Sequence, residues 1–316
     1  MYYIGIDLGG TNIAIGIVDE NYKIVKKGSV PTFANREPEE IVKDMGALCM
    51  KLLTETGIDV SEIARIGIAA PGSVDPKNGI IVHANNLPFD DVHVAEMLRK
   101  YCPVEKIYVD NDANAAALGE AMGGAAAGAE TSVMVTLGTG VGGGVIMGGK
   151  IYSGFNYAGA ELGHTVIEYN GVQCTCGRKG CWEAYSSATA LVRMTKEKLE
   201  ETKDTVMWDM IDGDISKANA RIAFAAMKQG DKAGKEVVDT YINYLACGIT
   251  NMVNTFQPDV LCIGGGVCNE KDYLLKPLTE IVGRDQYTSG FEIKTKICIA
   301  ELGNDAGIVG AAAITH

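Results

Sequence analysis

The hydrophobic positions of this chain gather into short strand-like runs bounded by glycine and into longer stretches with helical spacing. Residues 3–18 alternate or run apolar, with β-branched side chains on both sides of Gly9-Gly10. This pattern predicts a β-hairpin with the glycine pair in its turn. Because no helical pattern follows, the segment lacks the context of a Rossmann fingerprint or a P-loop, in which the glycines open a helix.

The same arrangement returns in residues 132–151, "SVMVTLGTGVGGGVIMGGKI", where Leu137–Gly140 stands between two strand-like runs. Gly138, Gly140 and Gly143 fit the string G-x-G-x-x-G. The residues that follow predict a β ribbon instead of a helix, which argues against a dinucleotide site. Two glycine turns of this kind can present backbone N–H groups to a polyphosphate from two sides.

A third glycine cluster, Gly264–Gly266, follows a strand predicted at Val260–Ile263 and leads towards a helical segment. Glycines in this position could accept the phosphates or ribose of a nucleotide. Amphipathic stretches between the strands predict helices near residues 39–57, 113–124, 188–202 and 236–256. Helices that alternate with strands indicate an α/β fold.

Composition and charge narrow the class of protein. The chain has 316 residues, 47% of them hydrophobic, which is enough for about two domains. Its 28 Lys and Arg against 40 Asp and Glu give a net charge of -12, so neither nucleic acid nor an anionic membrane is an expected partner. An odd count of nine cysteines, no basic leader and no bilayer-length apolar run favour reduced thiols and a cytoplasmic location.

Three of the cysteines lie in the run "QCTCGRKGCWE", and their spacing indicates a metal site. Cys174, Cys176 and Cys181 could bind zinc, and His164 is the best candidate for a fourth ligand. Such a shell leaves no open coordination position, so we expect a structural zinc and not a catalytic one. The two basic residues of the run are too few to indicate a nucleic-acid finger on an acidic chain.

Acids at predicted strand ends could serve phosphoryl transfer. Asp7 could reach a magnesium ion on the phosphates, or it could simply satisfy amides of the turn. Asp112 could accept the proton of an attacking hydroxyl, or it could only cap the helix that follows. Asp110 is a rival for the role of base, and spacing does not choose between the two acids.

Further polar residues could bind a polyol. Rigid support from the metal could direct Glu161, His164 and Glu183 into a cleft, where carboxylates accept hydrogen bonds from hydroxyl groups. The segment "PGSVDPKNGIIVHANNLPF" adds three short polar groups on loops, for which an ordinary role as turn residues fits equally well: Gly72, Asn85 and Asn86.

Together these motifs resemble the ROK family of sugar kinases (repressor, ORF, kinase), within the actin-like ATPase superfamily. The resemblance runs from "IGIDLGGTN" to "GNDAGIVGAA", and its most specific part is the signature C-x-C-G-x-x-G-C-x-E at Cys174 to Glu183. It implies two actin-like (ribonuclease H-like) α/β domains around a cleft. The expected N-terminal domain is 1–112 plus 300–316, and the expected C-terminal domain is 113–299 with a zinc loop at 164–183.

The resemblance also implies an activity: transfer of the γ-phosphoryl group of Mg-ATP to the 6-hydroxyl of a hexose. The set of polar candidates favours glucose, with mannose, fructose, allose or an N-acetylhexosamine as alternatives and a sugar-sensing regulator without catalysis as a further one. We expect no repressor role, because the DNA-binding domain of the family's repressors precedes a first strand that here begins at Tyr2 or Tyr3. The implied assembly is a homodimer, which could pair further.

Residue roles follow from the same resemblance. It implies that Asp112 is the catalytic base. The implied hexose contacts are Gly72, Asn86, Asn111, Asp112, Glu161, His164 and Glu183. The implied ATP contacts are Asp7, Gly9, Gly10, Thr11, Asn12, Gly138, Thr139, Gly140, Gly264, Gly265 and Gly266. The implied zinc ligands are His164, Cys174, Cys176 and Cys181. One departure from the family pattern is Ala188, where many members carry glycine.

Overall fold

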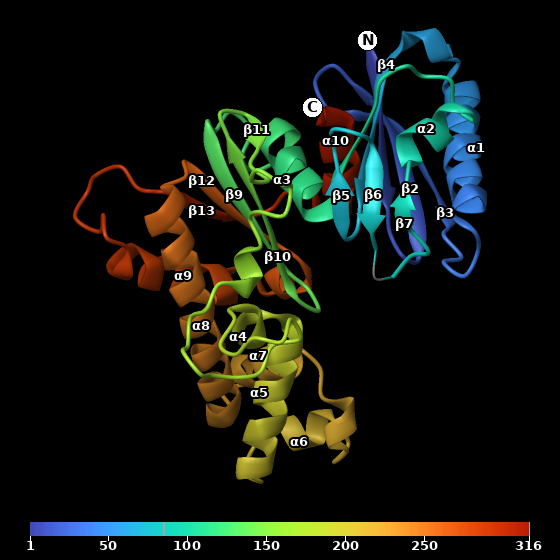
Figure 1. Cartoon of the computed structure of the whole chain (residues 1–316). Coiled ribbons are helices and arrows are strands. Elements are labelled where there is room, and N and C mark those ends of the chain that lie inside the picture. The colour runs from blue at the N-terminus through green and yellow to red at the C-terminus, as the bar shows by residue number, and fades with distance from the viewer. Residues whose placement is uncertain (85, 316) are drawn as a thin grey trace. The chain divides into compact units, whose positions relative to one another are not determined.

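A computed structural model describes residues 1–84 and 86–315 of the chain (Figure 1). Asn85, one of the loop residues considered above, and His316 lie outside the described residues. The contacts divide the chain into two compact units, each described by itself. Unit 1 comprises Met1–Met134, Gly144–Ala160 and Ala300–His316, and unit 2 comprises Val135–Gly143 and Glu161–Ile299.

Unit 1 contains a five-stranded sheet in the order β3-β2-β1-β4-β8. The predicted hairpin is confirmed, because β1 and β2 pair antiparallel on either side of the glycine turn. β4 and β8 continue the sheet parallel to β1. The strands are β1 (Tyr2–Leu8), β2 (Asn12–Asp19), β3 (Ile24–Pro31), β4 (Ile63–Ala70) and β8 (Ile107–Asn111). A small antiparallel sheet adds β5 (Ser73–Asp75), β6 (Ile80–His83) and β7 (Asp90–Val92).

Helices cover both faces of the first sheet (Figure 1). One face carries branched side chains such as Ile4 and Ile6 of β1, which are fully buried in a core shared with α1. The other face carries Gly5 and Gly67, whose missing side chains let the backbone of α10 approach directly. The helices of this unit are α1 (Pro38–Thr56), α2 (Val94–Arg99), α3 (Asp112–Gly123) and α10 (Ala306–Ala313), with short 3-10 turns at Val60–Glu62 and Gly303–Asp305.

A second five-stranded sheet has the order β11-β10-β9-β12-β13. Its strands are β9 (Thr131–Leu137), β10 (Val141–Met147), β11 (Lys150–Ile151), β12 (Val260–Gly264) and β13 (Lys296–Ile299). The second predicted strand-turn-strand is confirmed, and so is the third glycine cluster at the end of a strand. That cluster leads into a 3-10 turn, Gly266–Glu270, and then into helix α9 (Asp272–Asp285).

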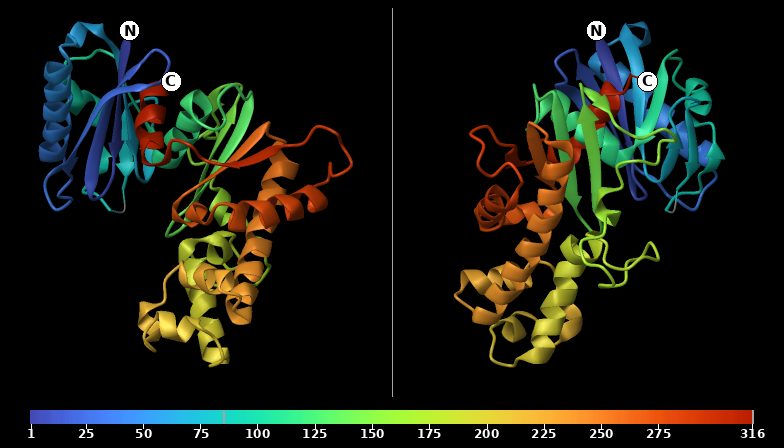
Figure 2. Two further views of the ribbon diagram at one scale, coloured as in Figure 1. Left: turned by 180° about the vertical axis from the view of Figure 1, so that it is seen from behind. Right: turned by 60° about the vertical axis from the view of Figure 1, so that its left-hand side comes forward.

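The remaining helices belong to unit 2, where α4, α5 and α7 pack on the long helix α8 and α6 packs on α7 (Figure 2). They are α4 (Glu183–Ser186), α5 (Ala188–Glu201), α6 (Met207–Met210), α7 (Ile222–Lys228) and α8 (Lys232–Phe256), with 3-10 turns at Leu162–His164 and Ile215–Lys217. α8 begins four residues before its predicted start, because Asp231 caps it by accepting a hydrogen bond from the Gly234 amide at 2.7 Å. Among the described residues no helix is long and apolar enough to span a bilayer.

The division into units differs from the expected boundary at residue 112. It assigns α3 to unit 1, together with the first part of β9 and the last part of β10. The physical reason lies in α10, which packs along α3 through glycines on both helices. A Cβ on Gly310 would lie 1.6 Å from the carbonyl oxygen of Ala115, so the two helix backbones are in direct contact.

We expect Gly310→Ala to destabilise the protein by about 3 kcal/mol, because the added methyl group must push two helix backbones apart. The matched control is Gly283→Ala in α9, where an added Cβ meets nothing of the described chain within 4 Å. We expect the control to be neutral or stabilising by up to about 1 kcal/mol. Free energies of unfolding in urea measure both effects. Equal effects at the two positions would contradict this account of the α3–α10 contact.

Candidate functional site

Unit 1 brings its predicted residues to one edge of the first sheet. Strands β1, β4 and β8 run parallel, and their register places Asp7 beside Ala69 and Ala69 beside Asp110. Their carboxyl ends therefore lie side by side. The glycine turn follows β1, Gly72 follows β4, and Asp112 follows β8.

Thr32, which was not predicted from the sequence, stabilises the turn after β1 by two hydrogen bonds. Gly9 donates its amide to the carbonyl of Asn12 at 3.0 Å. Thr32, which is fully buried, donates its hydroxyl to the carbonyl of Gly9 at 2.6 Å and its amide to that of Thr11 at 2.8 Å. The carbonyl groups of Gly9 and Thr11 are thereby both hydrogen-bonded to Thr32. Nothing in the local sequence marks Thr32, since its role depends on the pairing of β2 with β3.

Asp7 has the most strongly perturbed carboxyl group of this edge. Burial raises its pKa to about 6, and the nearby charge of Asp112 adds to the effect. Part of the burial comes from α10: a Cβ on Gly307 would lie 2.6 Å from Oδ2 of Asp7. Sequence reasoning also missed Gly307, although it lies within the quoted segment "GNDAGIVGAA". At neutral pH Asp7 is mainly ionised and suited to a cation.

The two rival acids, Asp110 near the end of β8 and Asp112 at the start of α3, occupy different environments. Asp110 is fully buried, and it accepts hydrogen bonds from the amide of Asn111 at 2.7 Å and from the side chain of Asn114 at 2.9 Å. These contacts fix the start of α3. Asp112 is exposed at the surface of unit 1, although surrounding protein atoms still raise its pKa. Only Asp112 is therefore open to a substrate hydroxyl, which supports the assignment that the resemblance implies.

Asn111 and Gly72 are linked to one another. The Asn111 side chain caps α3, with its Oδ1 accepting the amide of Ala113 at 2.9 Å, and its Nδ2 donates to the carbonyl of Gly72 at 3.1 Å. Gly72 has φ +87°, and a Cβ there would lie 2.1 Å from the carbonyl oxygen of His83. A residue with a side chain does not fit this position. Asn86, the remaining hexose candidate of this unit, lies against Gly10 of the turn.

In unit 2 the predicted metal ligands come together. The ligand atoms of His164, Cys174, Cys176 and Cys181 all lie within 4.8 Å of one another. The Sγ atoms of Cys176 and Cys181 are 3.6 Å apart, and Nδ1 of His164 is 3.7 Å from Sγ of Cys174. A tetrahedral zinc with Zn–S bonds near 2.3 Å requires sulfur atoms about 3.8 Å apart. The donor set and its spacing therefore fit a zinc ion.

Two predicted acids flank this metal cluster. Glu161 precedes the 3-10 turn that carries His164, and its carbonyl accepts the His164 amide at 3.1 Å. Glu183 begins α4 directly after the cluster, and its Oε1 lies 3.6 Å from Sγ of Cys174. Because Nδ1 of His164 faces the cysteines, its other ring nitrogen is left for a different partner.

The two glycine clusters predicted to bind nucleotide in this unit also lie close together. The amide of Gly138 donates to the carbonyl of Gly140 at 3.0 Å, which closes the turn between β9 and β10. Gly265 lies against the end of β9, where an added Cβ would lie 2.3 Å from the carbonyl oxygen of Leu137. The turn between β9 and β10 and the glycines at the end of β12 therefore lie next to each other.

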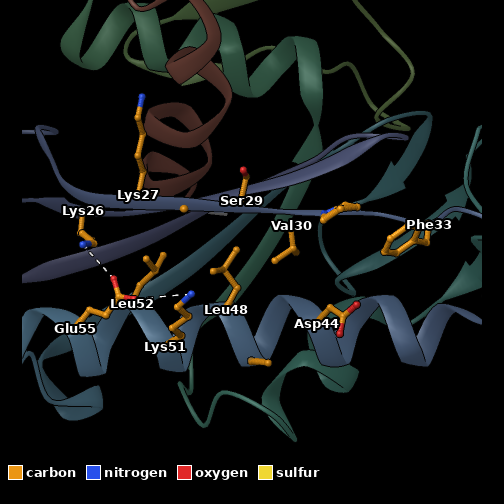
Figure 3. A pocket seen from close by; sticks show the side chains of 13 residues that line it. Lys26, Lys27, Ser29, Val30, Phe33, Asp44, Leu48, Lys51, Leu52 and Glu55 are labelled. Carbon is orange, nitrogen blue, oxygen red and sulfur yellow. Dashed lines mark ion pairs between the residues drawn. The ribbon is translucent and has the colours of Figure 1, made fainter.

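A hollow of about 540 Å³ in unit 1 lies away from these residues, between β3 and α1 (Figure 3). Its floor is apolar and includes Leu48 and Leu52; Glu55 of α1 forms an ion pair across it with Lys26 of β3 and another along the helix with Lys51. Among the described residues, none of those predicted to bind hexose, nucleotide or metal lines it. We assign it no part in the site.

Comparison with known proteins identifies the class to which this arrangement belongs. A family model described as "ROK family" matches residues 3–316. A glucokinase from Thermotoga maritima is 37% identical over 315 residues, which cover 98% of this chain and 96% of that protein. A ROK family glucokinase from Streptomyces griseus, solved in complex with glucose and AMPPNP, has a TM-score of 0.77 and 32% identity, covering 99% of this chain and 98% of the other.

A ROK hexokinase from Thermus thermophilus is also similar, with a TM-score of 0.83 and 32% identity, covering 99% of this chain and 97% of the other. The fold is thus that of the sugar kinases with the actin-like ATPase architecture, as expected from the sequence. The chain belongs to the ROK family.

The raised pKa of Asp7 predicts a pH-dependent cost in stability. The folded state binds a proton more tightly than the unfolded state, so this contribution is most favourable below pH 4 and is lost as the pH rises through about 6. Asp7→Asn should therefore be more stable than wild type at pH 7.5, by up to about 3 kcal/mol. The difference should shrink as the pH falls towards 4. Denaturant unfolding at several pH values measures it, and a difference independent of pH would contradict the assigned cause.

Proposed function

We propose that this chain is an ATP-dependent glucose kinase that transfers the γ-phosphoryl group of Mg-ATP to the 6-hydroxyl of glucose. The observation that carries the proposal is the exposed carboxylate of Asp112 at the end of β8, in a chain whose near full-length relatives are glucokinases. Membership of the ROK family and the kinase fold support it independently of any single residue.

The proposed reaction needs one proton acceptor. The hexose oxygen forms a bond to the γ-phosphorus, the bond between that phosphorus and the ADP oxygen breaks, and Asp112 takes the hydroxyl proton. Such transfers depend mainly on positioning, so a carboxylate whose pKa is raised by burial, as that of Asp112 is, can serve as the acceptor. Magnesium, when bound, neutralises charge on the phosphates. Asp7 is the residue in unit 1 that we propose holds it, directly or through water.

Backbone amides are proposed to hold the nucleotide. In unit 1 Thr32 donates to the carbonyls of Gly9 and Thr11, and these hydrogen bonds fix the orientation of two peptide units in the turn Gly9–Asn12. In unit 2 the same task falls to Gly138–Gly140 and to Gly264–Gly266 at the end of β12. Preformed loops of this kind reduce the entropy lost when a phosphate binds.

Hexose contacts are proposed for each unit by itself: Gly72, Asn86, Asn111 and Asp112 in unit 1, and Glu161, His164 and Glu183 in unit 2. Glucose is favoured by this set and by the relatives named glucokinase. An epimer changes a single hydrogen bond, worth about 1 kcal/mol, so mannose and other hexoses remain the alternatives to test.

The metal cluster is proposed to hold one structural zinc. Four ligands close its coordination, so its role is to fix the loop from which His164 and Glu183 reach the hexose. The expected homodimer and the cytoplasmic location stay predictions, which rest on the resemblance and on the composition respectively.

Replacement of Asp112 tests the assigned base. We expect Asp112→Asn to lower kcat for glucose by a factor of at least about 100, because the amide does not accept the hydroxyl proton. ADP release with Mg-ATP across a panel of hexoses measures turnover and specificity in one experiment. Glucose should give the highest kcat/KM in wild type. Equal turnover in the variant would reject Asp112 as the base, and no turnover of any hexose by wild type would reject the kinase.

Removal of one cysteine tests the zinc. We expect about one zinc per chain in the purified protein, by elemental analysis, and a loss of most of it in Cys176→Ser. The KM for glucose should rise in the variant, because the loop that carries Glu183 loses its anchor. Cys247→Ser, at an exposed cysteine outside the cluster, is the matched control and should keep both zinc and KM. Zinc-free wild type with normal stability and KM would contradict the proposed role.

A further inference from the structure

The turn Gly138–Val141 is held by a short segment that begins at the proposed hexose contact Glu183. Residues 183–189, here named the connecting segment, run from the start of α4 into the first turn of α5. The amide of Ala188 donates to the carbonyl of Gly138 at 2.8 Å. The hydroxyl of Thr189 donates to the carbonyl of Thr139, also at 2.8 Å. Two successive carbonyls of the turn thus point at the start of α5.

This arrangement determines which way the turn amides point. A trans peptide unit is planar, and its C=O and N–H point in opposite directions. With the carbonyls of Gly138 and Thr139 directed at α5, the amides of Thr139 and Gly140 are directed away from it. Two consecutive N–H groups on one face form the kind of concave site that binds phosphate oxygens.

The same segment also reaches the turn through Glu183. Its Oε2 accepts the amide of Val141 at 3.0 Å. The approach is close enough that a Cβ on Gly140 would lie 2.3 Å from Oε2, so a side chain at this position would displace the carboxylate. Oε1 of Glu183 faces the other way, with the hydroxyl of Thr175 at 3.4 Å and the thiol of Cys174 at 3.6 Å.

We infer that the connecting segment joins the hexose side of unit 2 to its nucleotide turn, and that Thr189 is a positioning residue for the phosphates of ATP. The inference rests on the proposed function in taking the turn as a nucleotide contact and Glu183 as a hexose contact. Glu183 is then shared between two tasks, since its carboxylate binds the hexose and also fixes the turn. If nucleotide binding at the turn changes the affinity for hexose through Glu183, hexose binding changes the affinity for nucleotide by the same factor.

The connecting segment also gives the departure at Ala188 a physical explanation. Its contact with the turn is made by the backbone amide, which alanine and glycine share. Ala188 has an ordinary helical position at the start of α5, so its methyl group does not disturb the contact. The contact of Thr189 is made by its side-chain hydroxyl, so a substitution can remove it.

The first experiment separates nucleotide from hexose binding. Calorimetry measures the Kd of Mg-AMPPNP without hexose and the Kd of glucose without nucleotide, each on the full chain. Thr189→Val keeps the shape of the side chain and removes the donor, so the Kd of Mg-AMPPNP should rise about three- to tenfold. The Kd of glucose and the zinc content should stay within about twofold of wild type. Thr189→Ser keeps the donor and should restore the nucleotide Kd.

The second experiment addresses the shared carboxylate. Glu183→Gln keeps an oxygen that can accept the amide of Val141, whereas Glu183→Ala does not. Both variants should weaken glucose binding. Only Glu183→Ala should also raise the Kd of Mg-AMPPNP. Zinc content and the midpoint of thermal unfolding show whether each variant keeps the native structure, and Thr189→Ser provides the folded reference.

The outcomes separate this inference from the proposed function. A wild-type protein that binds Mg-AMPPNP but phosphorylates no hexose would reject the kinase, while the Thr189 comparison would still decide the inference. Equal nucleotide Kd values for wild type and Thr189→Val would reject the positioning role. Weaker binding of both ligands in Thr189→Val, together with loss of zinc or a lowered midpoint of thermal unfolding, would reject it too, because that result indicates a general loss of structure. An unchanged nucleotide Kd in Glu183→Ala would reject the shared role of Glu183.

Discussion

The parallel pairing of β1, β4 and β8 is the constraint on which unit 1 depends. It places the glycine turn after β1, the loop at Gly72 and the acid Asp112 at one edge of one sheet. The same pairing requires a helix close above the sheet, and α10 meets that requirement because glycines of β1 and β4 let its backbone approach. This close packing also buries Asp7, which raises its pKa to about 6. Function and packing therefore follow from one arrangement of strands.

Unit 2 is organised differently, by four side chains that could hold a metal ion and by a short segment that follows them. Four ligand atoms lie close enough for one tetrahedral ion, and Glu183 begins a helix directly after them. Residues 161–182, which precede α4, contain only one short 3-10 turn as regular structure, so a bound metal would be an effective way to order them. The hydrogen bonds from residues 183–189 then extend this order to the turn after β9.

Much of the fold and of the candidate site could be predicted from the sequence, because the sequence patterns that indicate them are local. Strand-turn-strand patterns, the helix periods and the spacing of Cys174, Cys176 and Cys181 are all read within a few residues of one another. Asp110 and Asp112 could not be separated by spacing, since burial depends on what packs above β8. Thr32, Gly307 and Thr189 were missed for a similar reason. Each acts on a turn or side chain far away in the chain, through a contact that only the tertiary structure provides.

The central claim is that the chain phosphorylates glucose at its 6-hydroxyl, and identification of the product tests it most directly. Phosphorus NMR of the purified protein with Mg-ATP and glucose follows the γ-phosphate signal and any phosphate ester that replaces it. The account predicts that glucose 6-phosphate and ADP appear in equal amounts. Hydrolysis of ATP without a sugar phosphate, or a phosphate on a different hydroxyl, would contradict it.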